Sequence, residues 1–266
     1  MPPYNARMLT PRLIFARLAS FLLPLLLLAG AVQGQTPEDV VHSFAGQKLL
    51  LRALGDHKEA KLKKKDLAKM TGTCDLAVEV TEASWERGKA RFRLVEIGSP
   101  YLPNRPRGVC KRTSTYDEGT LELSGFAADE KPEDLTASIG QVLQTPEQYL
   151  SALGVPFDLP RLGPEGYAGT VPERVSQAVT APRQILGIDP TYSEEARQAK
   201  FQADCVLWLV IGPDGRVHDS RITRQAGYGL EEHAMNVLPL WRFEPARKDG
   251  KPVAVQLNME VYFHLY

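Results

Sequence analysis

A base, a carboxylate and a nucleophile stand side by side at His218, Asp219 and Ser220, a grouping that invites comparison with a hydrolase. These residues belong to Val217 to Arg224, a polar run that we predict to be a half-exposed strand. Neighbouring residues of a strand point to opposite faces, so the three side chains cannot converge as a catalytic triad requires. The chain also lacks a Gly-x-Ser-x-Gly elbow and a glycine-rich phosphate loop. We therefore predict no catalytic residues.

Metal ligands and cofactor-binding residues are not predicted either. The five histidines are scattered without the spacing of a ligand set, and the three cysteines match no zinc pattern. The histidines are His42, His57, His218, His233 and His264.

The three cysteines have different expected roles. Cys74 and Cys110 form a candidate disulfide, with two unpaired thiols as the open alternative. Cys205 shares the face of Leu207 and Leu209 in a strand-like run, which indicates a small core residue.

The last stretch of the chain is predicted to be one long strand, Val253 to Tyr266. Every second residue is apolar and the residues between them are mostly polar, the period of a strand with one buried and one wet face. Such a strand would overhang its neighbours and offer unpaired backbone groups to another extended chain.

The preceding elements would complete a small domain with two layers. Cys205 to Ile211 reads as a strand, Gly212 to Arg216 as a tight turn, and Val217 to Arg224 as the return strand. An amphipathic helix follows, which Pro239 should end or kink about one turn before Trp241. Ser193 is a suitable cap for an earlier helix. The expected order is helix, strand, hairpin, strand, helix, strand.

Spaced motifs in this stretch resemble the C-terminal domain of the TonB family, from about residue 180 to residue 266. They are Pro190-x-Tyr192-x-x-x-Ala196, Gly212-Pro213-Asp214-Gly215-x-Val217, Gly227-x-x-Leu230-x-x-x-Ala234, Trp241-Arg242-Phe243-x-Pro245-Ala246, Gly250-Lys251-Pro252-Val253 and Val261-x-Phe263-x-Leu265.

The resemblance implies a fold, a function and partners. The fold class would be α+β. A mainly antiparallel β domain would come first in the chain, followed by a C-terminal two-layer domain with a three-stranded antiparallel sheet and helices. The function would be non-catalytic binding of an outer-membrane TonB-dependent receptor, or another extended peptide, by strand addition, linked to transport across the outer membrane. Inner-membrane motor proteins and a second copy of the chain are further expected partners. The residues expected to bind the partner are Tyr192, Val253, Val255, Leu257, Met259, Val261 and Phe263.

Two other readings stay open at this point. A self-associating envelope scaffold or adaptor without energy transduction would use the same strand. An enzyme with its site in the middle of the chain is a third reading. Trp208 is expected on the face away from the helices, where either the linker or the middle domain, or else a partner or a second copy, would cover it.

Four segments are predicted along the chain. Residues 1–34 read as a secretion signal, with a basic region ending at Arg17, an apolar run and small residues, although a retained membrane anchor is the alternative. Residues 36–153 are expected to form a β-rich domain ending in helices, the second capped by Thr145. Residues 154–189 are rich in Pro and Gly and read as a linker, and residues 190–266 form the C-terminal domain.

Composition and charge indicate an exported globular protein. The chain is 43% hydrophobic and 24% charged, with 32 basic and 32 acidic residues. Removal of the first segment with its three arginines leaves a small net negative charge, which argues against nucleic-acid binding. The expected location is the periplasm, with anchoring to the inner membrane if the first segment is retained.

Overall fold

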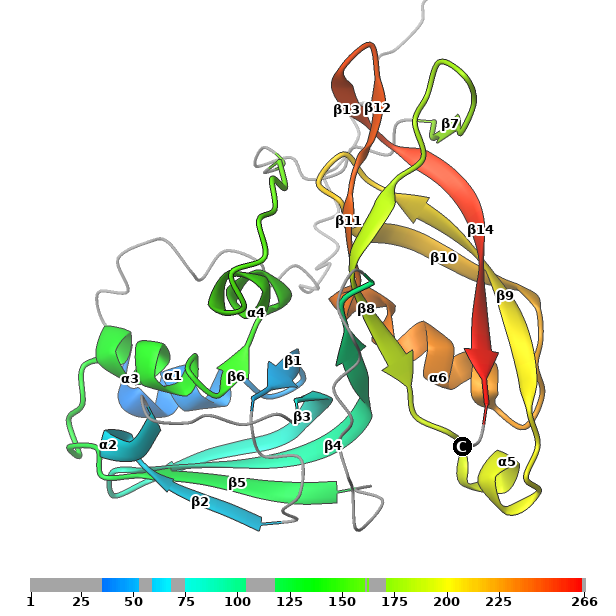
Figure 1. Cartoon of the computed structure of the whole chain (residues 1–266). Coiled ribbons are helices and arrows are strands. Elements are labelled where there is room, and N and C mark those ends of the chain that lie inside the picture. The colour runs from blue at the N-terminus through cyan, green and yellow to red at the C-terminus, as the bar shows by residue number, and fades with distance from the viewer. Residues whose placement is uncertain are drawn as a thin grey trace, which may run out of the picture. The chain divides into compact units, whose positions relative to one another are not determined.

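The computed structural model describes residues 35–52, 59–67, 75–103, 118–160, 162 and 171–264 (Figure 1). It is a mixed α+β fold with many strands and few, short helices, as predicted. The predicted signal segment, Cys74 and Cys110 lie outside the described residues.

The elements before residue 160 form a β-rich part. Their bounds are α1 Pro37–His42, β1 Lys48–Leu51, β2 Glu59–Lys63, α2 Lys64–Leu67, β3 Leu76–Glu86, β4 Lys89–Tyr101, β5 Glu118–Ser124, α3 Pro132–Ile139, β6 Leu143–Gln144 and α4 Pro146–Ala152.

The elements after residue 170 form the C-terminal part. Their bounds are β7 Glu173–Arg174, β8 Arg183–Pro190, α5 Glu194–Gln198, β9 Ala203–Ile211, β10 Val217–Arg224, α6 Leu230–Val237, the 3-10 helix η1 Leu238–Leu240, β11 Arg242–Glu244, β12 Ala246–Lys248, β13 Lys251–Val253 and β14 Val255–Phe263.

Strands β3 and β4 form the long hairpin at the centre of the β-rich part. Their turn consists of Arg87 and Gly88, whose φ angles of 47° and 77° suit a two-residue hairpin turn. A side chain at Gly88 would meet the Phe126 carbonyl oxygen at 2.3 Å, so this turn needs glycine for space as well as for φ.

Helices α1 and α3 cover one face of this sheet (Figure 1). Val41 from α1 and Leu135 from α3 are fully buried in the same cluster as Phe92 of β4. The predicted cap of α4 is confirmed, since the Thr145 hydroxyl accepts from the Gln148 backbone N–H and Pro146 occupies the first turn.

The C-terminal part contains the expected two layers. Strands β10, β9 and β14 are antiparallel neighbours, and α6 covers one face of them. Cys205 and Leu207 of β9 are fully buried with Leu230 and Ala234 of α6. The predicted core position of Cys205 is confirmed, and burial raises the pKa of its thiol to about 11.

Both predicted helix boundaries in this part are confirmed. Ser193 caps α5, because its hydroxyl accepts from the Ala196 backbone N–H at 3.1 Å. Helix α6 ends at Val237 and the chain continues as η1 around Pro239, which cannot donate a helical hydrogen bond.

The structure differs from the sequence prediction in the last strand and in the linker. The single strand predicted from Val253 is divided at Ala254: β13 pairs with β12, while β14 belongs to the main sheet. The Pro/Gly-rich segment contains β8, an eight-residue strand with Leu186 and Ile188 almost fully buried.

Strand β8 lies between the two parts of the chain. It pairs with β11 on one side and with the end of β4 on the other, within an eight-stranded sheet of the described residues. Residues Gly34–Tyr266 consequently make up one compact unit. The predicted boundaries at residues 153 and 190 stay a prediction.

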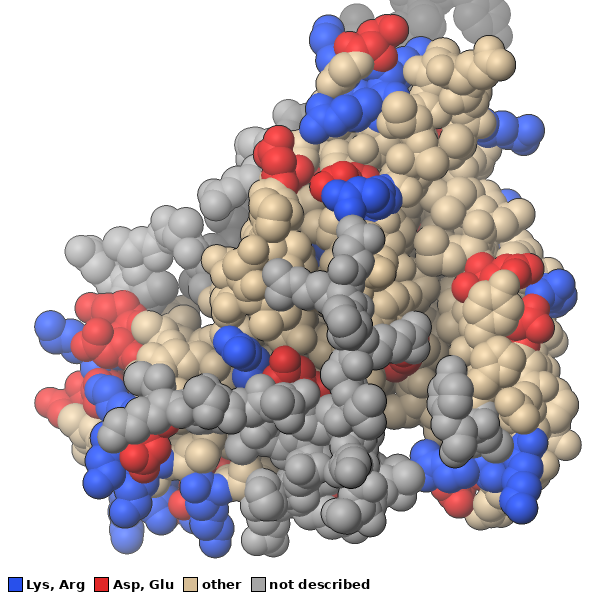
Figure 2. All heavy atoms as spheres, in the orientation of Figure 1, with Lys and Arg blue, Asp and Glu red and all other residues tan. Residues whose placement is uncertain are grey.

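None of the described helices has the length and apolar character needed to cross a bilayer. On the face shown in Figure 2, acidic and basic side chains are interspersed, without a large field of one sign.

Candidate functional site: the open edge of strand β14

Strand β14 has a neighbour along its whole length on one side only. It pairs with β9 from Val255 opposite Ile211 to Phe263 opposite Ala203. On the other side β7 pairs in parallel with only Val255 and Gln256, at the beginning of β14 (Figure 1). Among the described residues, no strand pairs with Leu257 to Phe263 on this side, which we call the open edge.

The backbone groups that face the open edge follow from the contact with β7. The Glu173 backbone N–H donates to the Ala254 carbonyl at 2.9 Å, so the Ala254 carbonyl points to the β7 side. Backbone groups of an antiparallel strand point alternately to its two neighbours. Asn258, Glu260 and Tyr262 therefore direct their N–H and C=O groups to the open edge.

The side chains predicted to bind a partner mostly face the core. Val255, Val261 and Phe263 are buried, and Leu257 and Met259 are half-buried in the same cluster. The burial of these side chains sets which face of β14 packs against the core. The residues between them place their side chains on the outer face. Val253 lies on β13 instead, opposite Ala246.

Tyr192 lies at the end of β14, beside Phe263. The two ring centroids are 5.6 Å apart and the rings are perpendicular. Burial raises the pKa of the Tyr192 hydroxyl, and within the described part of the chain this hydroxyl has no hydrogen-bond partner. Tyr192 thus supports the last residues of the open edge from the core side.

The outer face of the same sheet carries Trp208. Its ring is half-buried, and the Arg221 guanidinium lies 4.2 Å from the ring centroid. Trp208 is thus partly covered from within the chain, by this arginine of the neighbouring strand β10. Val175, which follows β7, lines a groove together with Trp208 and Arg221.

Charged residues cluster at the far end of the open edge. Arg224 is ion-paired with Asp204, and its Nη2 atom lies 3.5 Å from Glu260 Oε1. The Tyr262 hydroxyl donates to Glu260, and this hydrogen bond raises the pKa of Tyr262. Charges on an exposed edge hinder unspecific pairing with other strands.

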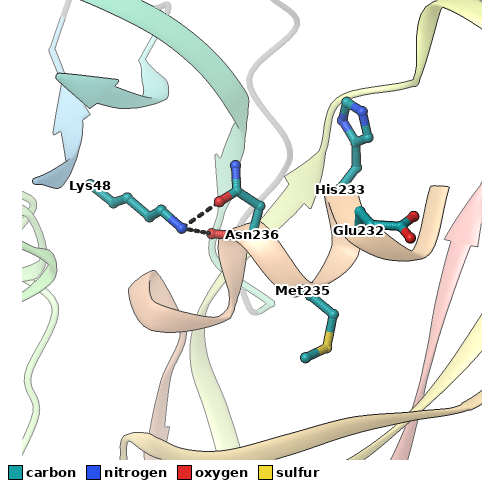
Figure 3. Close-up of a pocket in the computed structure, with 5 residues that line it drawn as sticks. All are labelled: Lys48, Glu232, His233, Met235 and Asn236. Atoms are coloured by element: carbon teal, nitrogen blue, oxygen red, sulfur yellow. Dashed lines mark hydrogen bonds between the residues drawn. The ribbon is translucent and has the colours of Figure 1, made fainter. Parts of the chain in front are cut away.

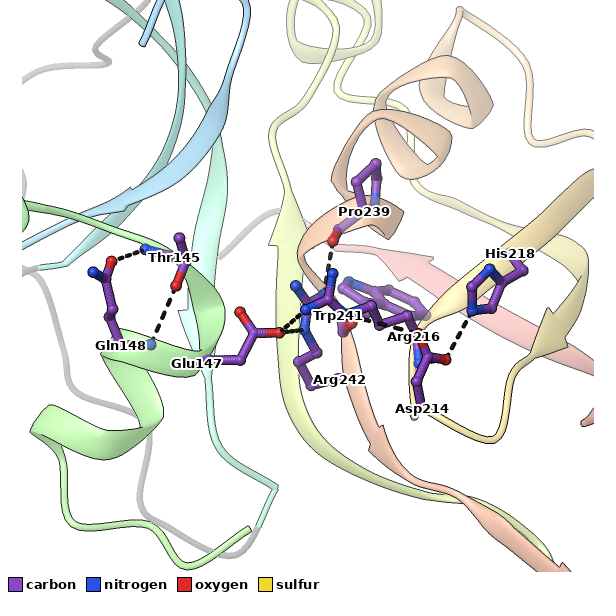
Figure 4. Close-up of polar contacts among 9 residues, drawn as sticks. All are labelled: Thr145, Glu147, Gln148, Asp214, Arg216, His218, Pro239, Trp241 and Arg242. Carbon is purple, nitrogen blue, oxygen red and sulfur yellow. Dashed lines mark hydrogen bonds and ion pairs between the residues drawn. The ribbon is translucent and has the colours of Figure 1, made fainter. Parts of the chain in front are cut away.

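A partly buried ion-pair network, which has no signal in the sequence, joins α4 to the C-terminal part (Figure 4). Glu147 Oε1 accepts from Arg242 Nε at 2.7 Å and from Arg216 Nη2 at 2.8 Å. The Arg242 side chain is only 5% exposed and also donates to the Pro239 and Trp241 carbonyls. Burial favours a higher pKa for Glu147, but the two arginines outweigh it and hold its pKa below the ordinary value.

The residues that resembled a triad take other partners. His218 Nε2 lies 2.8 Å from Asp214 Oδ1 (Figure 4), and the Ser220 backbone N–H donates to Asp219. Asp214 also accepts from the Arg216 backbone N–H, so it stabilises the turn between β9 and β10.

A cavity of about 530 Å³ lies beside α6 and β1 (Figure 3). Lys48 Nζ donates to the Asn236 carbonyl there at 3.1 Å. His233 Nδ1 is 2.9 Å from the Thr191 hydroxyl, and burial lowers the pKa of His233. Figure 3 shows Glu232, His233 and Met235 pointing in different directions, so their side chains do not converge on one ligand.

Comparison with known proteins adds the family of this part of the chain. The family model described as Gram-negative bacterial TonB protein C-terminal matches residues 188–265. These residues form a TonB C-terminal domain. The match covers less than a third of the 266 residues, and a search of curated proteins found no match.

The motifs of the TonB C-terminal domain contact one another in the structure. Gly215 has a φ of 72°, and its carbonyl accepts from the Phe243 backbone N–H at 2.9 Å. A side chain at Gly215 would meet the Phe243 carbonyl oxygen at 2.0 Å. The glycine turn and the Trp-Arg-Phe motif therefore pack directly against each other.

The family match also describes the class of this domain. The TonB C-terminal family is a non-enzymatic domain associated with transport at the cell envelope. In the part of the chain that the structure describes, no group of histidine, cysteine and acidic side chains could hold a metal ion. The open edge of β14 is the candidate site of this domain because, among the described residues, its backbone groups have a strand partner on one side only.

Proposed function

We propose that this protein is a non-catalytic, TonB-like protein of the periplasm that binds an extended segment of an outer-membrane receptor by strand addition. The partner would pair with the open edge of β14 and so take part in transport across the outer membrane. The observation that carries the proposal is the pairing of β14, which is complete toward β9 and restricted to two residues toward β7.

Backbone hydrogen bonds would supply most of the affinity. Asn258, Glu260 and Tyr262 offer an N–H and a C=O each, and an intramolecular hydrogen bond contributes about 0.5–1.5 kcal/mol net. Ordering a flexible peptide opposes part of this gain. We therefore expect a transient complex with a dissociation constant in the micromolar range. A dissociation constant of 1 μM corresponds to a binding free energy of about −8 kcal/mol.

A proline at position 260 tests the proposal. Glu260→Pro removes an N–H that faces the open edge and places a ring there, while the hydrogen bonds to β9 remain. We expect at least a tenfold loss of affinity for a synthetic extended peptide from the receptor, measured by fluorescence anisotropy with the full chain.

Glu260→Ala is the matched control, because it removes the contacts with Arg224 and Tyr262 without touching the backbone. Its affinity should stay within about twofold of the unchanged protein. Equal binding by the proline variant, with an unchanged melting temperature, would contradict strand addition on this edge.

Self-association through the same edge is the competing function. An open strand edge can pair with its copy as well as with a peptide. Sedimentation of the full chain separates the two: a monomer that binds peptide supports the proposal, and a dimer that Glu260→Pro dissociates supports the scaffold.

A further inference from the structure

A groove of about 600 Å³ lies on the outer face of the sheet, beside the open edge. Strands β10, β9, β14 and β7 all contribute to it. The residues that line it are Arg174, Val175, Trp208, Arg221, Thr223, Gln256, Leu257 and Asn258.

The groove is positively charged. Arg174 and Arg221 are both exposed, and none of the described lining residues is acidic. Neither arginine forms an ion pair with a carboxylate of the described residues; Arg221 instead lies over the Trp208 ring. Two guanidinium groups without a counter-ion favour an anionic ligand.

The strand register connects this groove to a docked partner. Arg221 lies opposite Trp208, and Trp208 lies opposite Asn258, so one row of side chains crosses the sheet on its outer face. Asn258 is the last residue of this row and faces the open edge. A partner strand on that edge would continue the row, because directly opposite residues share a face.

Arg174 lies at the same edge, one row earlier. It pairs with Gln256 of β14, two residues before Asn258. Residues two apart along a strand lie about 7 Å from one another on the same face. The side chain of a partner residue opposite Asn258 would therefore enter the groove between Arg174 and Arg221.

We propose that this groove binds the carboxylate of an acidic side chain on the partner strand, at the position opposite Asn258. The inference rests on the proposed function and names the chemistry of the partner. Guanidinium and carboxylate groups pair with charge-assisted, often bidentate hydrogen bonds. The backbone edge would then supply affinity and the groove would select the register of the partner.

A glutamate scan tests this selection. The probes are threonine-rich extended peptides carrying a fluorescent label and a single Glu at successive positions, each compared with the peptide carrying Gln there. With the full chain we expect Glu at one position to bind about fivefold more tightly than Gln. That preference should disappear in Arg174→Gln combined with Arg221→Gln.

Arg247→Gln is the matched control, because Arg247 is an exposed arginine of β12 outside the groove and donates to the Gly250 carbonyl. It should leave the glutamate preference unchanged. Arg221→Lys, which keeps the charge, should retain part of it.

The outcomes separate this inference from the proposed function. Peptides that all bind but show no preference for Glu would overturn the carboxylate site alone. Absence of binding by any peptide would overturn the proposed function, and the carboxylate site with it. Arginine-dependent binding of phosphatidylglycerol vesicles, without a glutamate preference, would mean that the groove is a lipid site.

Discussion

Glu147 joins two motifs that lie far apart in the sequence. Its carboxylate accepts from Arg242, next to Trp241, and from Arg216, in the turn between β9 and β10. The buried Arg242 guanidinium needs this acceptor, because an unpaired charge inside a protein is strongly destabilising. One side chain of α4 thereby stabilises the centre of the TonB C-terminal domain.

Removal of this charge should destabilise the protein in a pH-dependent way. We expect Glu147→Gln to lower the free energy of unfolding by about 2 kcal/mol at neutral pH. The folded-state pKa of Glu147 lies below its ordinary value of 4.5, so the stabilisation is complete above about pH 4.5 and is lost as the pH falls through the folded-state pKa. Thermal unfolding of Glu147→Gln and of the unchanged protein, at pH values above and below 4.5, measures this difference in stability.

Glu133→Gln is the control for the Glu147 prediction. Glu133 also lies in the first turn of a helix, α3, but it is exposed. Its loss should change the stability by less than about 0.5 kcal/mol. A difference between Glu147→Gln and the unchanged protein that persists undiminished in acid would contradict the assigned role.

At the scale of elements, the contact between β4 and β8 depends on the absence of side chains. A Cβ at Gly98 would lie 2.4 Å from the Asp189 carbonyl oxygen. A Cβ at Gly187 would lie 2.2 Å from the Tyr101 ring. Both residues lie within the paired segment of the two strands, so glycine permits their close approach.

Gly98→Ala should therefore destabilise the junction of β4 and β8. The methyl group meets backbone, which cannot move as a flexible side chain can, and overpacking of this kind costs about 1–3 kcal/mol. Gly140→Ala is the control, since its closest neighbour would be 3.2 Å away and its φ is an ordinary −63°. Chemical denaturation should give a lower midpoint for Gly98→Ala than for Gly140→Ala. Equal midpoints for the two variants would contradict the close approach of β4 and β8.

The elements that could be predicted from the sequence carry their own local signals. Thr145, Ser193 and Pro239 mark helix ends through side-chain and backbone chemistry, and alternation marks β9 and β14. Strand β8 has no such signal: prolines flank it, and its buried residues acquire a strand partner, β4, from about 90 residues earlier in the chain. The break at Ala254 likewise depends on the pairing of Val253 with Ala246.

The candidate site was predictable only in outline. The sequence indicates a strand with one wet face, and the residues named from it were the apolar ones that face the core. Which backbone groups remain unpaired depends on β9 and β7, and the latter comes from the segment read as a linker. The role of Glu147 has no local signal in the sequence, because its arginine partners lie 69 and 95 residues away.

At the scale of the whole molecule, the β-rich part and the TonB C-terminal domain are joined by more than their connecting chain. Strand β8 hydrogen-bonds to β4, and Glu147 binds Arg242 and Arg216. Without these contacts, the backbone groups of β8 that face β4 would need water as a partner, and the buried Arg242 guanidinium would lack its carboxylate. The TonB C-terminal domain of this protein should consequently depend on the part that precedes it.

A fragment from Pro172 to Tyr266 tests this dependence. It retains β7 to β14 but loses β4 and Glu147, so we expect a lower melting temperature than for the full chain and faster hydrogen exchange of the β8 amides. The β9 amides, which keep both neighbours in the fragment, serve as the internal reference. Equal protection of β8 in fragment and full chain would contradict the prediction.

Cys205 gives this domain a native chemical reporter of its opening. The thiol is fully buried under α6, its pKa is raised to about 11, and its residue lies opposite Val261 of β14. Only a thiolate reacts with an alkylating reagent, so modification requires β9 to become exposed first. The alkylation rate of Cys205 therefore measures how often the strand behind the open edge separates from its core, without any label introduced into the chain.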